Sequence, residues 1–137
     1  MVEGQLFIFK LDDDYFGLDL DMVEQIIPYT KITKVPNMPD YIEGIIPMRD
    51  DLCTVFNLRK RFSLPDREAD ENTRIVTVRI NSEMIGFIID NTNEIVHNYE
   101  VDAAKNANKK VNKFITGTTD IDGKHINIIA PDRIISA

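Results

Sequence analysis

The chain of 137 residues contains no tryptophan, two histidines and a single cysteine, Cys53. A lone cysteine cannot form an internal disulfide, which is typical of proteins in a reducing compartment. No apolar run approaches the roughly 20 residues that a membrane-spanning helix requires. The first residues also lack the basic and then apolar pattern of a signal peptide. We therefore expect a cytoplasmic protein that is not inserted into a membrane.

A catalytic or metal-binding set of residues is missing as well. His97 and His125 are far apart in the sequence, and no cysteine or paired carboxylates accompany them, which argues against a zinc site. The segment 120–123 begins like a calcium-binding loop but has no glutamate at the required distance, so we interpret it as a hairpin turn. Cys53 has no nearby histidine and is interpreted as a packing residue. We predict no enzymatic activity, no metal and no cofactor.

The charge of the chain bears on its partners. The formal net charge is −7, which opposes nonspecific attraction to nucleic acid and to anionic lipid. Four lysines lie within residues 105–113, but no aromatic residues are interleaved with them, as a strand-binding surface would need. A small barrel that binds single-stranded nucleic acid is therefore the less favoured alternative, and protein partners are preferred.

Two pairs of similar segments occur in the chain. The segment that starts at Phe16 recurs, shifted by 69 positions, in the segment that starts at Ile85. Both have an apolar strand pattern with a glycine near its start, an aspartate at its end and a short apolar return. A second pair of similar segments starts at Gly44 and at Gly117. Repetition of this kind indicates duplicated folding units, and a duplicated β unit without a catalytic set suggests a protein that works by binding.

Short apolar runs between frequent turn signals predict an all-β protein with little helix. The clearest strand candidates are residues 6–9, 15–20, 44–48, 52–56, 74–80, 84–90, 114–118 and 125–129, and short helices are expected at 58–62 and 131–135. The polar segment 63–73 is the clearest linker. We predict one barrel over residues 1–66 and another over 67–137, with the alternative that their terminal strands are exchanged. Lobes of this size are marginal alone, so we expect them to pack together around a groove.

Several motifs occur in the order found in one protein family. Residues 36–44 fit the pattern P-x-x-P-x-[FY]-I-x-G, Arg49 closes the strand that follows, and residues 57–62 form a [DN]-L-R-x-x-F element. Residues 23–27 lie where that family has V-Q-E-I, residues 85–96 match its G-x-x-V-D-x-V-x-E-V element, and 114–117 match its late I-x-G. The chain resembles the CheW family of bacterial chemotaxis coupling proteins over nearly its whole length.

The resemblance implies a cytoplasmic scaffold of two five-stranded barrels, SH3-like or OB-like in form. Proteins of this family bridge the cytoplasmic tips of methyl-accepting chemoreceptors to the regulatory domain of the histidine kinase CheA, within membrane-associated receptor arrays. The expected partners are these two proteins, and no nucleic acid. By their places in the motifs, the receptor-binding groove is assigned to Val23, Gln25, Ile32 and Arg49, and the kinase-binding surface to Pro39, Tyr41 and Gly44.

Each assignment has a structural alternative. Ile26 is a further candidate for the lining of the receptor groove, but it is assigned to core packing. Pro39 and Gly44 have the alternative role of fixing a turn, and Tyr41 that of capping a barrel. An arginine in a strand-end turn, such as Arg49, is often only a surface charge that contributes little energy.

The chain departs from the family pattern at three places, the simplest being Thr54, which stands where the family has a second proline after the arginine. The family sequence N-L-R-G becomes P-M-R-D over residues 47–50, so the glycine that tolerates positive φ is absent. The V-Q-E-I element becomes V-E-Q-I over residues 23–26, which moves the carboxylate to the opposite face of a strand. These departures leave the fold intact. They make altered receptor recognition the alternative to the usual coupling role.

Overall fold

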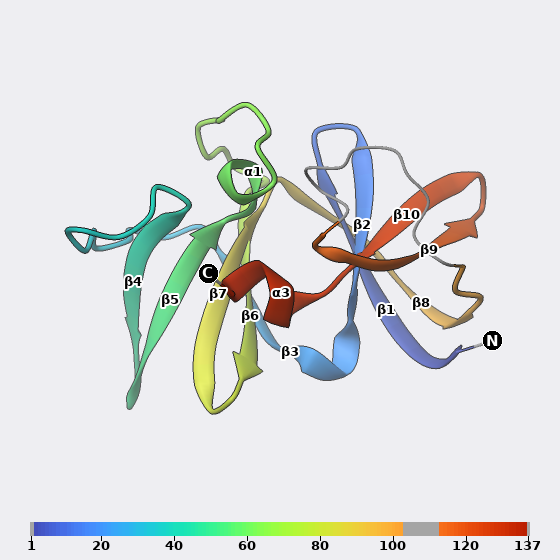
Figure 1. The fold of residues 1–137 in the computed structure, drawn as a ribbon, viewed down its shortest axis with the longest axis horizontal. Helices are drawn as coiled ribbons and strands as arrows, with labels where there is room; N and C mark the ends of the chain where they lie inside the picture. Colours follow the sequence, from blue (N-terminus) through green and yellow to red (C-terminus); the bar gives the residue numbers. More distant parts are fainter. Residues whose placement is uncertain (1, 103–112, 137) are drawn as a thin grey trace. The chain divides into compact units, whose positions relative to one another are not determined.

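The computed structural model describes residues 2–102 and 113–136. The chain forms two compact units, one combining Met1–Met22 with Asn91–Ala137, the other formed by the continuous segment Val23–Asp90 (Figure 1). Of the four lysines within residues 105–113, only Lys113 lies in the described part of the chain. No helix in the described part of the chain is long and apolar enough to cross a membrane.

The first unit contains a five-stranded sheet with the strand order β8-β1-β2-β10-β9. Its strands are β1 (Val2–Leu11), β2 (Asp14–Asp19), β8 (Asn91–Tyr99), β9 (Ile115–Ile121) and β10 (Lys124–Ile129). β10 pairs with β2 in parallel, and the other neighbours are antiparallel. A 3-10 turn, η1 (Leu20–Met22), follows β2. The short helix α3 (Pro131–Ile135) follows β10 and begins with proline, as predicted, because the first helical turn needs no N–H there.

The second unit contains a five-stranded sheet with the order β3-β6-β7-β5-β4. Its strands are β3 (Val23–Pro28), β4 (Ile42–Met48), β5 (Asp51–Asn57), β6 (Arg74–Ile80) and β7 (Glu83–Ile89). Here β5 pairs with β7 in parallel. The short helix α1 (Leu58–Arg61) follows β5, and the Asn57 side chain caps it by accepting a hydrogen bond from Lys60 N at 3.1 Å.

The two units share one topology, which confirms the predicted duplication and the all-β fold class. In the second unit, Val55 of β5 lies opposite both Gly44 of β4 and Gly86 of β7. In the first unit, Ile128 of β10 lies opposite both Gly117 of β9 and Gly17 of β2. The sequence repeats that begin near Phe16 and Ile85 are therefore equivalent strands, β2 and β7, in equivalent sheets.

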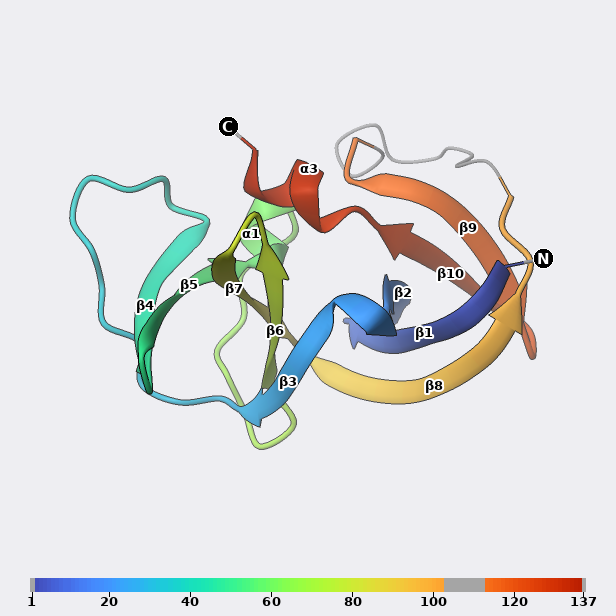
Figure 2. The same cartoon turned by 90° about the horizontal axis from the view of Figure 1, so that it is seen from below.

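Each unit is assembled from both repeats. The hairpin β1–β2 pairs with β8 and β10 from the second repeat, while the hairpin β6–β7 pairs with β3 and β5 from the first (Figure 2). The chain passes between units at Met22/Val23 and at Asp90/Asn91. The expected boundary at 66/67 instead lies inside the second unit, where the polar segment 63–73 connects α1 to β6. Backbone pairing decides the division, and composition does not reveal it.

Gly44 and Gly117 lie where each sheet closes on itself. Thr33 and Ile45 exchange two backbone hydrogen bonds of 2.9 and 2.8 Å, and Asp102 and Thr118 exchange two of 2.8 and 2.9 Å. A Cβ on Gly44 would lie 2.0 Å from the Thr33 carbonyl oxygen, and one on Gly117 would lie 2.8 Å from the Asp102 carbonyl oxygen. Gly44 also has a φ of 146°, a conformation that side chains disfavour. The segment around Thr33 therefore approaches β4 so closely that position 44 must be glycine.

Each unit has its own apolar core. In the first unit a cluster forms around Leu6, Ile8, Tyr99, Ile126 and Ile128. In the second a cluster forms around Ile46, Cys53, Val55 and Ile75. Cys53 is fully buried, and burial followed by the charge of Asp51 raises the pKa of its thiol to about 11. The neutral thiol therefore acts as a small packing group.

We expect Gly44→Ala to lower the free energy of unfolding by about 2 to 3 kcal/mol, because the new methyl group would separate Thr33 from Ile45. Urea denaturation followed by circular dichroism measures the change. Gly4→Ala is the matched control, since a Cβ there meets nothing within 4 Å, and it should change stability by less than about 0.5 kcal/mol. Equal effects of the two substitutions would contradict the close-approach argument.

Candidate functional site

All seven residues assigned to partner binding from the sequence lie in the second unit. Val23 and Gln25 are on β3, and Gly44 is on β4. Ile32, Pro39 and Tyr41 lie in the connection between β3 and β4, and Arg49 lies in the turn between β4 and β5.

Arg49 lies at the tip of the β4–β5 hairpin. Met48 and Asp51 are paired across the two strands, so Arg49 and Asp50 form the turn. The residue with positive φ is Arg49 itself, at 43°, and not Asp50, which replaces the family glycine. The Arg49 side chain is exposed, and it makes no hydrogen bond or ion pair within the described part of the chain. Its guanidinium group is thus available to a partner.

Strand β3 presents both polar and apolar side chains at the edge of the sheet. Gln25 is exposed, and its backbone N–H donates to Thr77 Oγ1 at 3.0 Å. Ile27 packs against the core cluster, so the neighbouring Ile26 points to the opposite face and is 40% exposed. The assignment of Ile26 to the core is therefore wrong. Val23 is half-buried.

Ile32 occupies a different environment from the exposed residues of β3. Its side chain packs against the cluster of Ile46, Cys53, Val55 and Ile75. Its backbone neighbour Thr33 closes the sheet through Ile45. The described contacts give Ile32 a core-packing role.

A network centred on Arg79 connects β3 with the base of the Arg49 turn. Arg79 Nε donates to Glu24 Oε1 at 2.9 Å, and Arg79 Nη2 donates to Asp51 Oδ2 at 3.2 Å. Arg79 Nη1 also donates to the Ser82 carbonyl oxygen at 3.0 Å. The hydrogen bonds to Glu24 and then to Asp51 raise the pKa of Arg79. The carboxylate displaced to position 24 is therefore neutralised within the protein and is not a free anionic contact.

Sequence reasoning missed this role of Arg79. An arginine at the end of an otherwise apolar strand was the available signal, but its two carboxylate partners come from strands that are distant in sequence. Only the order of strands in the sheet brings Glu24, Arg79 and Asp51 together.

Tyr41 is held between two neighbours in the second unit. Its ring stacks on Phe56 with centroids 5.9 Å apart, and the Arg61 guanidinium lies 4.3 Å from the Tyr41 ring centroid. Its carbonyl oxygen accepts a hydrogen bond from Asn57 N at 2.7 Å. These contacts fit the role of a cap on the barrel. Pro39 is exposed, and its carbonyl oxygen accepts a bond from Ile42 N at 3.0 Å.

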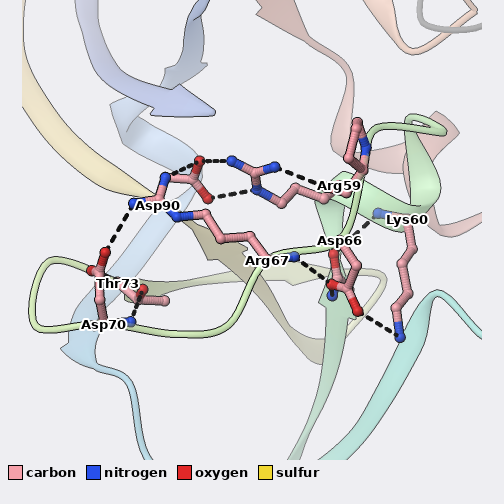
Figure 3. A network of polar contacts seen from close by, with 9 residues as sticks. Arg59, Lys60, Asp66, Arg67, Asp70, Thr73 and Asp90 are labelled. Carbon is pink, nitrogen blue, oxygen red and sulfur yellow. Dashed lines mark hydrogen bonds and ion pairs between the residues drawn. The ribbon is translucent and has the colours of Figure 1, made fainter. Parts of the chain in front are cut away.

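A second polar network fastens the segment 63–73 to the sheet of the second unit (Figure 3). The Arg59 side chain, 6% exposed, forms a bidentate ion pair with Asp90, in which Nε donates to Oδ1 at 3.0 Å and Nη2 donates to Oδ2. Arg59 Nη1 donates to the Pro65 carbonyl oxygen at 2.8 Å. Arg67 Nη1 donates to Asp90 Oδ2 at 3.2 Å, and Arg67 Nη2 bonds to Asp70 at 2.9 Å. The [DN]-L-R-x-x-F motif thus contributes a buried structural arginine.

A cavity of about 640 Å³ lies beside this network. Its charged lining residues are the cations Lys34, Arg59, Lys60 and Arg67 and the anions Glu43, Asp66, Glu68 and Asp90. Lys60 pairs with Glu43 at 3.4 Å and with Asp66 at 3.7 Å. Burial disfavours the charge of Lys60, but the two carboxylates outweigh this effect and raise its pKa. Because cations and anions balance, the cavity favours neither an anionic nor a cationic ligand.

Metal chemistry finds no support in the part of the chain that the structure describes. No group of three or more His, Cys, Asp or Glu side chains there comes together in a way that could hold a metal ion. His125 Nδ1 instead lies 2.9 Å from Asp120 Oδ1 across the β9–β10 hairpin, both exposed. The segment 120–123 is the predicted hairpin turn.

The duplicated sheets and the exposed surface around Arg49 are those of a small β-scaffold protein. Residues 5–137 match the sequence model of the family described as the CheW-like domain, and the chain belongs to that family. It is a chemotaxis adaptor, and the alternative of a barrel that binds single-stranded nucleic acid is not favoured.

Individual relatives agree with the family match. The chemotaxis protein CheW of Bacillus subtilis is 27% identical over 134 residues, which cover 96% of this chain and 86% of the relative. The chemotaxis protein CheW of Klebsiella aerogenes is 29% identical over 94 residues, 68% of this chain and 57% of that protein. The crystal structure of the scaffolding protein TtCheW from Thermoanaerobacter tengcongensis has a TM-score of 0.87 at 30% identity, covering 94% of this chain and 90% of that chain.

We expect Arg59→Leu to lower the free energy of unfolding by about 3 kcal/mol, because it leaves the mostly buried Asp90 carboxylate without its bidentate partner. Urea denaturation measures the loss. Arg67→Gln is the matched control, since the Arg67 side chain is 45% exposed and its ion pairs should contribute less than about 1 kcal/mol. If the Arg59 variant is no less stable than the Arg67 variant, burial does not determine how much each arginine of the network contributes to stability.

Proposed function

We propose that this adaptor couples the cytoplasmic tips of methyl-accepting chemoreceptors to the regulatory domain of the histidine kinase CheA. It acts in the cytoplasm, has no enzymatic activity of its own, and works through two protein–protein contacts. The observation that carries the proposal is the CheW-like family match over residues 5–137, supported by the 0.87 TM-score to a scaffolding protein. Coupling needs surfaces for two partners on one small protein.

Arg49 is the proposed anchor for the receptor. Three properties support this role: the side chain is exposed, it lacks an internal partner among the described residues, and it projects from a turn with defined backbone geometry. A guanidinium group that is not already paired can form bidentate hydrogen bonds to a carboxylate or to carbonyl groups of a partner. Arginine is also among the residue types enriched in binding hot spots.

The exposed part of β3 is the proposed second element of the receptor surface. Gln25 can donate and accept hydrogen bonds, and Ile26, which points to the other face of this edge strand, adds exposed apolar area. A receptor helix that lies across this strand would use apolar side chains for area and polar ones for register. Val23 is half-buried at the start of the strand, and Ile32 supports the surface from the core.

The Arg79 network favours a variant form of receptor recognition. Glu24 is tied to Arg79, so the carboxylate that the family pattern has at the next position is not offered to a partner. Gln25 offers an amide in its place. We therefore propose that the receptor surface which docks here lacks a cation opposite Gln25, in contrast to a surface that would pair with a glutamate.

The kinase-facing surface is proposed to include Pro39 and Tyr41. Pro39 is exposed in the segment that leads to β4. Tyr41 is fixed by Phe56 and Arg61, which reduces the entropy that its ordering at an interface would cost. Gly44 contributes by allowing the sheet to close beneath this segment.

The experiment that tests the proposed function is a pair of calorimetric titrations with the full-length chain. One uses the CheA regulatory domain and the other a receptor-tip fragment from the same cell. Binding to both is the expected result. Binding to the kinase domain alone would mean that positions 47–50 and 25 have abolished receptor docking, and binding to neither partner by a folded protein would overturn the coupling function.

We expect Arg49→Ala to weaken receptor-fragment binding by at least about 30-fold, or about 2 kcal/mol, while kinase-domain binding and the free energy of unfolding stay unchanged. Arg49→Lys should recover only part of the loss, because lysine lacks the planar fork. Lys10→Ala, in the other unit, is the charge-matched control and should bind as the unaltered chain does. A loss within about 0.5 kcal/mol for Arg49→Ala would make Arg49 an ordinary surface residue.

A further inference from the structure

The shared topology allows the same place to be compared in the two units. Val55 and Ile128 are equivalent by strand register, so the residues that follow them also correspond. Asn57 caps α1 and Ala130 occupies the same position before α3. The second residue of the helix is Arg59 in one unit and Asp132 in the other. By the register of β7 and β2, Asp90 corresponds to Asp21 and Ile88 to Asp19.

The second unit fills this place with its own arginine. The stem of Arg59 is buried, and its guanidinium is bound by the Asp90 carboxylate and by the Pro65 carbonyl oxygen. The two charges compensate each other inside the unit. The equivalent place in the first unit has aspartate at all three corresponding positions, Asp19, Asp21 and Asp132, so none of these positions supplies a cation.

The first unit has a cavity of about 300 Å³ at this place. Buried apolar groups of Ile128, Ile129, Ala130 and Pro131 form part of its lining, and the carboxylates of Asp19 and Asp132 add negative charge. No lysine, arginine or histidine is among its described lining residues. Asp19 Oδ1 accepts a hydrogen bond from Asp21 N at 3.0 Å, whereas the Asp132 carboxylate makes no hydrogen bond or ion pair within the described residues.

Tyr99 supplies a separate sign that a ligand belongs in this cavity. It lines the cavity and is 8% exposed, yet its hydroxyl group has no hydrogen-bond partner among the described residues. A buried polar group without a partner is costly, so such groups are normally satisfied. Burial, followed by the charges of Asp19 and Asp21, raises the pKa of Tyr99, which keeps the hydroxyl neutral and able to accept a bond from a cation.

We propose that this cavity of the first unit binds an arginine side chain supplied by a partner protein. The arginine stem lies against the apolar wall, and its guanidinium reaches the carboxylates of Asp19 and Asp132 and the Tyr99 hydroxyl. Arginine fits better than lysine, because five N–H donors in a planar fork can satisfy several acceptors at once. The partner thus supplies in trans the group that Arg59 supplies in cis in the other unit.

This binding site does not depend on the proposed function. It lies in the first unit, whereas the residues assigned to the receptor and the kinase lie in the second. The chemistry defines the partner as a protein with an exposed arginine, whichever protein presents it.

The test is a nuclear magnetic resonance titration of the ¹⁵N-labelled full-length chain with the peptide acetyl-Gly-Arg-Gly-amide. A single charged side chain should bind with a dissociation constant of about 1 to 10 mM at low salt. The backbone amide signals of Tyr99, Val101, Thr116 and Asp132 are expected to show chemical-shift changes that saturate as peptide is added. The matched peptide with citrulline, which keeps the shape but loses the charge, should give at least about tenfold weaker binding.

Variants locate the site. Asp19→Asn combined with Asp132→Asn should abolish the saturable shifts, whereas Asp13→Asn, which removes an exposed turn carboxylate, should leave them unchanged. Asp132→Arg should prevent binding of the peptide, because it places an internal arginine at the position that Arg59 occupies in the second unit. Equal responses to the arginine and citrulline peptides, no saturation at tens of millimolar, or unchanged binding in the double variant would each overturn the proposal.

Discussion

Each unit depends on a parallel pairing between strands that come from different repeats. In the second unit, β5 runs beside β7, with Val55 opposite Gly86; in the first, β10 runs beside β2, with Ile128 opposite Gly17. A Cβ on Gly86 would lie 2.9 Å from the Ile75 side chain, and one on Gly17 would lie 2.8 Å from the Leu6 side chain. Glycine at these positions therefore lets the neighbouring hairpin strand fill the core beneath the central ladder. The edge strands, the short helices and the exposed turns are all positioned by this ladder.

The two units use one frame for different electrostatic purposes. In the second unit, the charges of Arg59 and Asp90 compensate each other in a buried ion pair. The charge of Arg79 compensates those of Glu24 and Asp51 in more exposed ion pairs. Because both nearby carboxylates are paired with Arg79, Arg49 has no ion-pair partner among the residues that the structure describes. In the first unit the positions equivalent to the Arg59–Asp90 pair carry only aspartate. Duplication has therefore kept the backbone while the side chains at matching places have diverged in charge.

Patterns of local origin could be predicted from the sequence. The strands around Phe16 and Ile85, the glycines at 44 and 117 and the short helices after β5 and β10 follow from spacing and turn chemistry over a few residues. The division of the chain could not, because the polar segment 63–73 resembles a linker although strand pairing holds both of its ends in one unit. Ile26 was assigned to the core although the edge position of β3 exposes it. The Arg79 network could not be predicted without knowing the order of the strands. The cavity lined by Asp19 and Asp132 could be recognised only by comparing the strand registers of the two units.

The exchange of hairpins also sets an order for folding during synthesis. Val23–Asp90 is continuous, so its five strands are all available once Asp90 has left the ribosome. The β1–β2 hairpin is made first but completes its sheet last, because its neighbours β8 and β10 end at Tyr99 and Ile129. At about 5 to 20 residues per second, that hairpin spends several seconds with unpaired strand edges. The apolar strand from Leu6 to Phe9 therefore waits longer for its partners than any strand of the second unit, and a chain divided between residues 66 and 67 would leave both sheets incomplete.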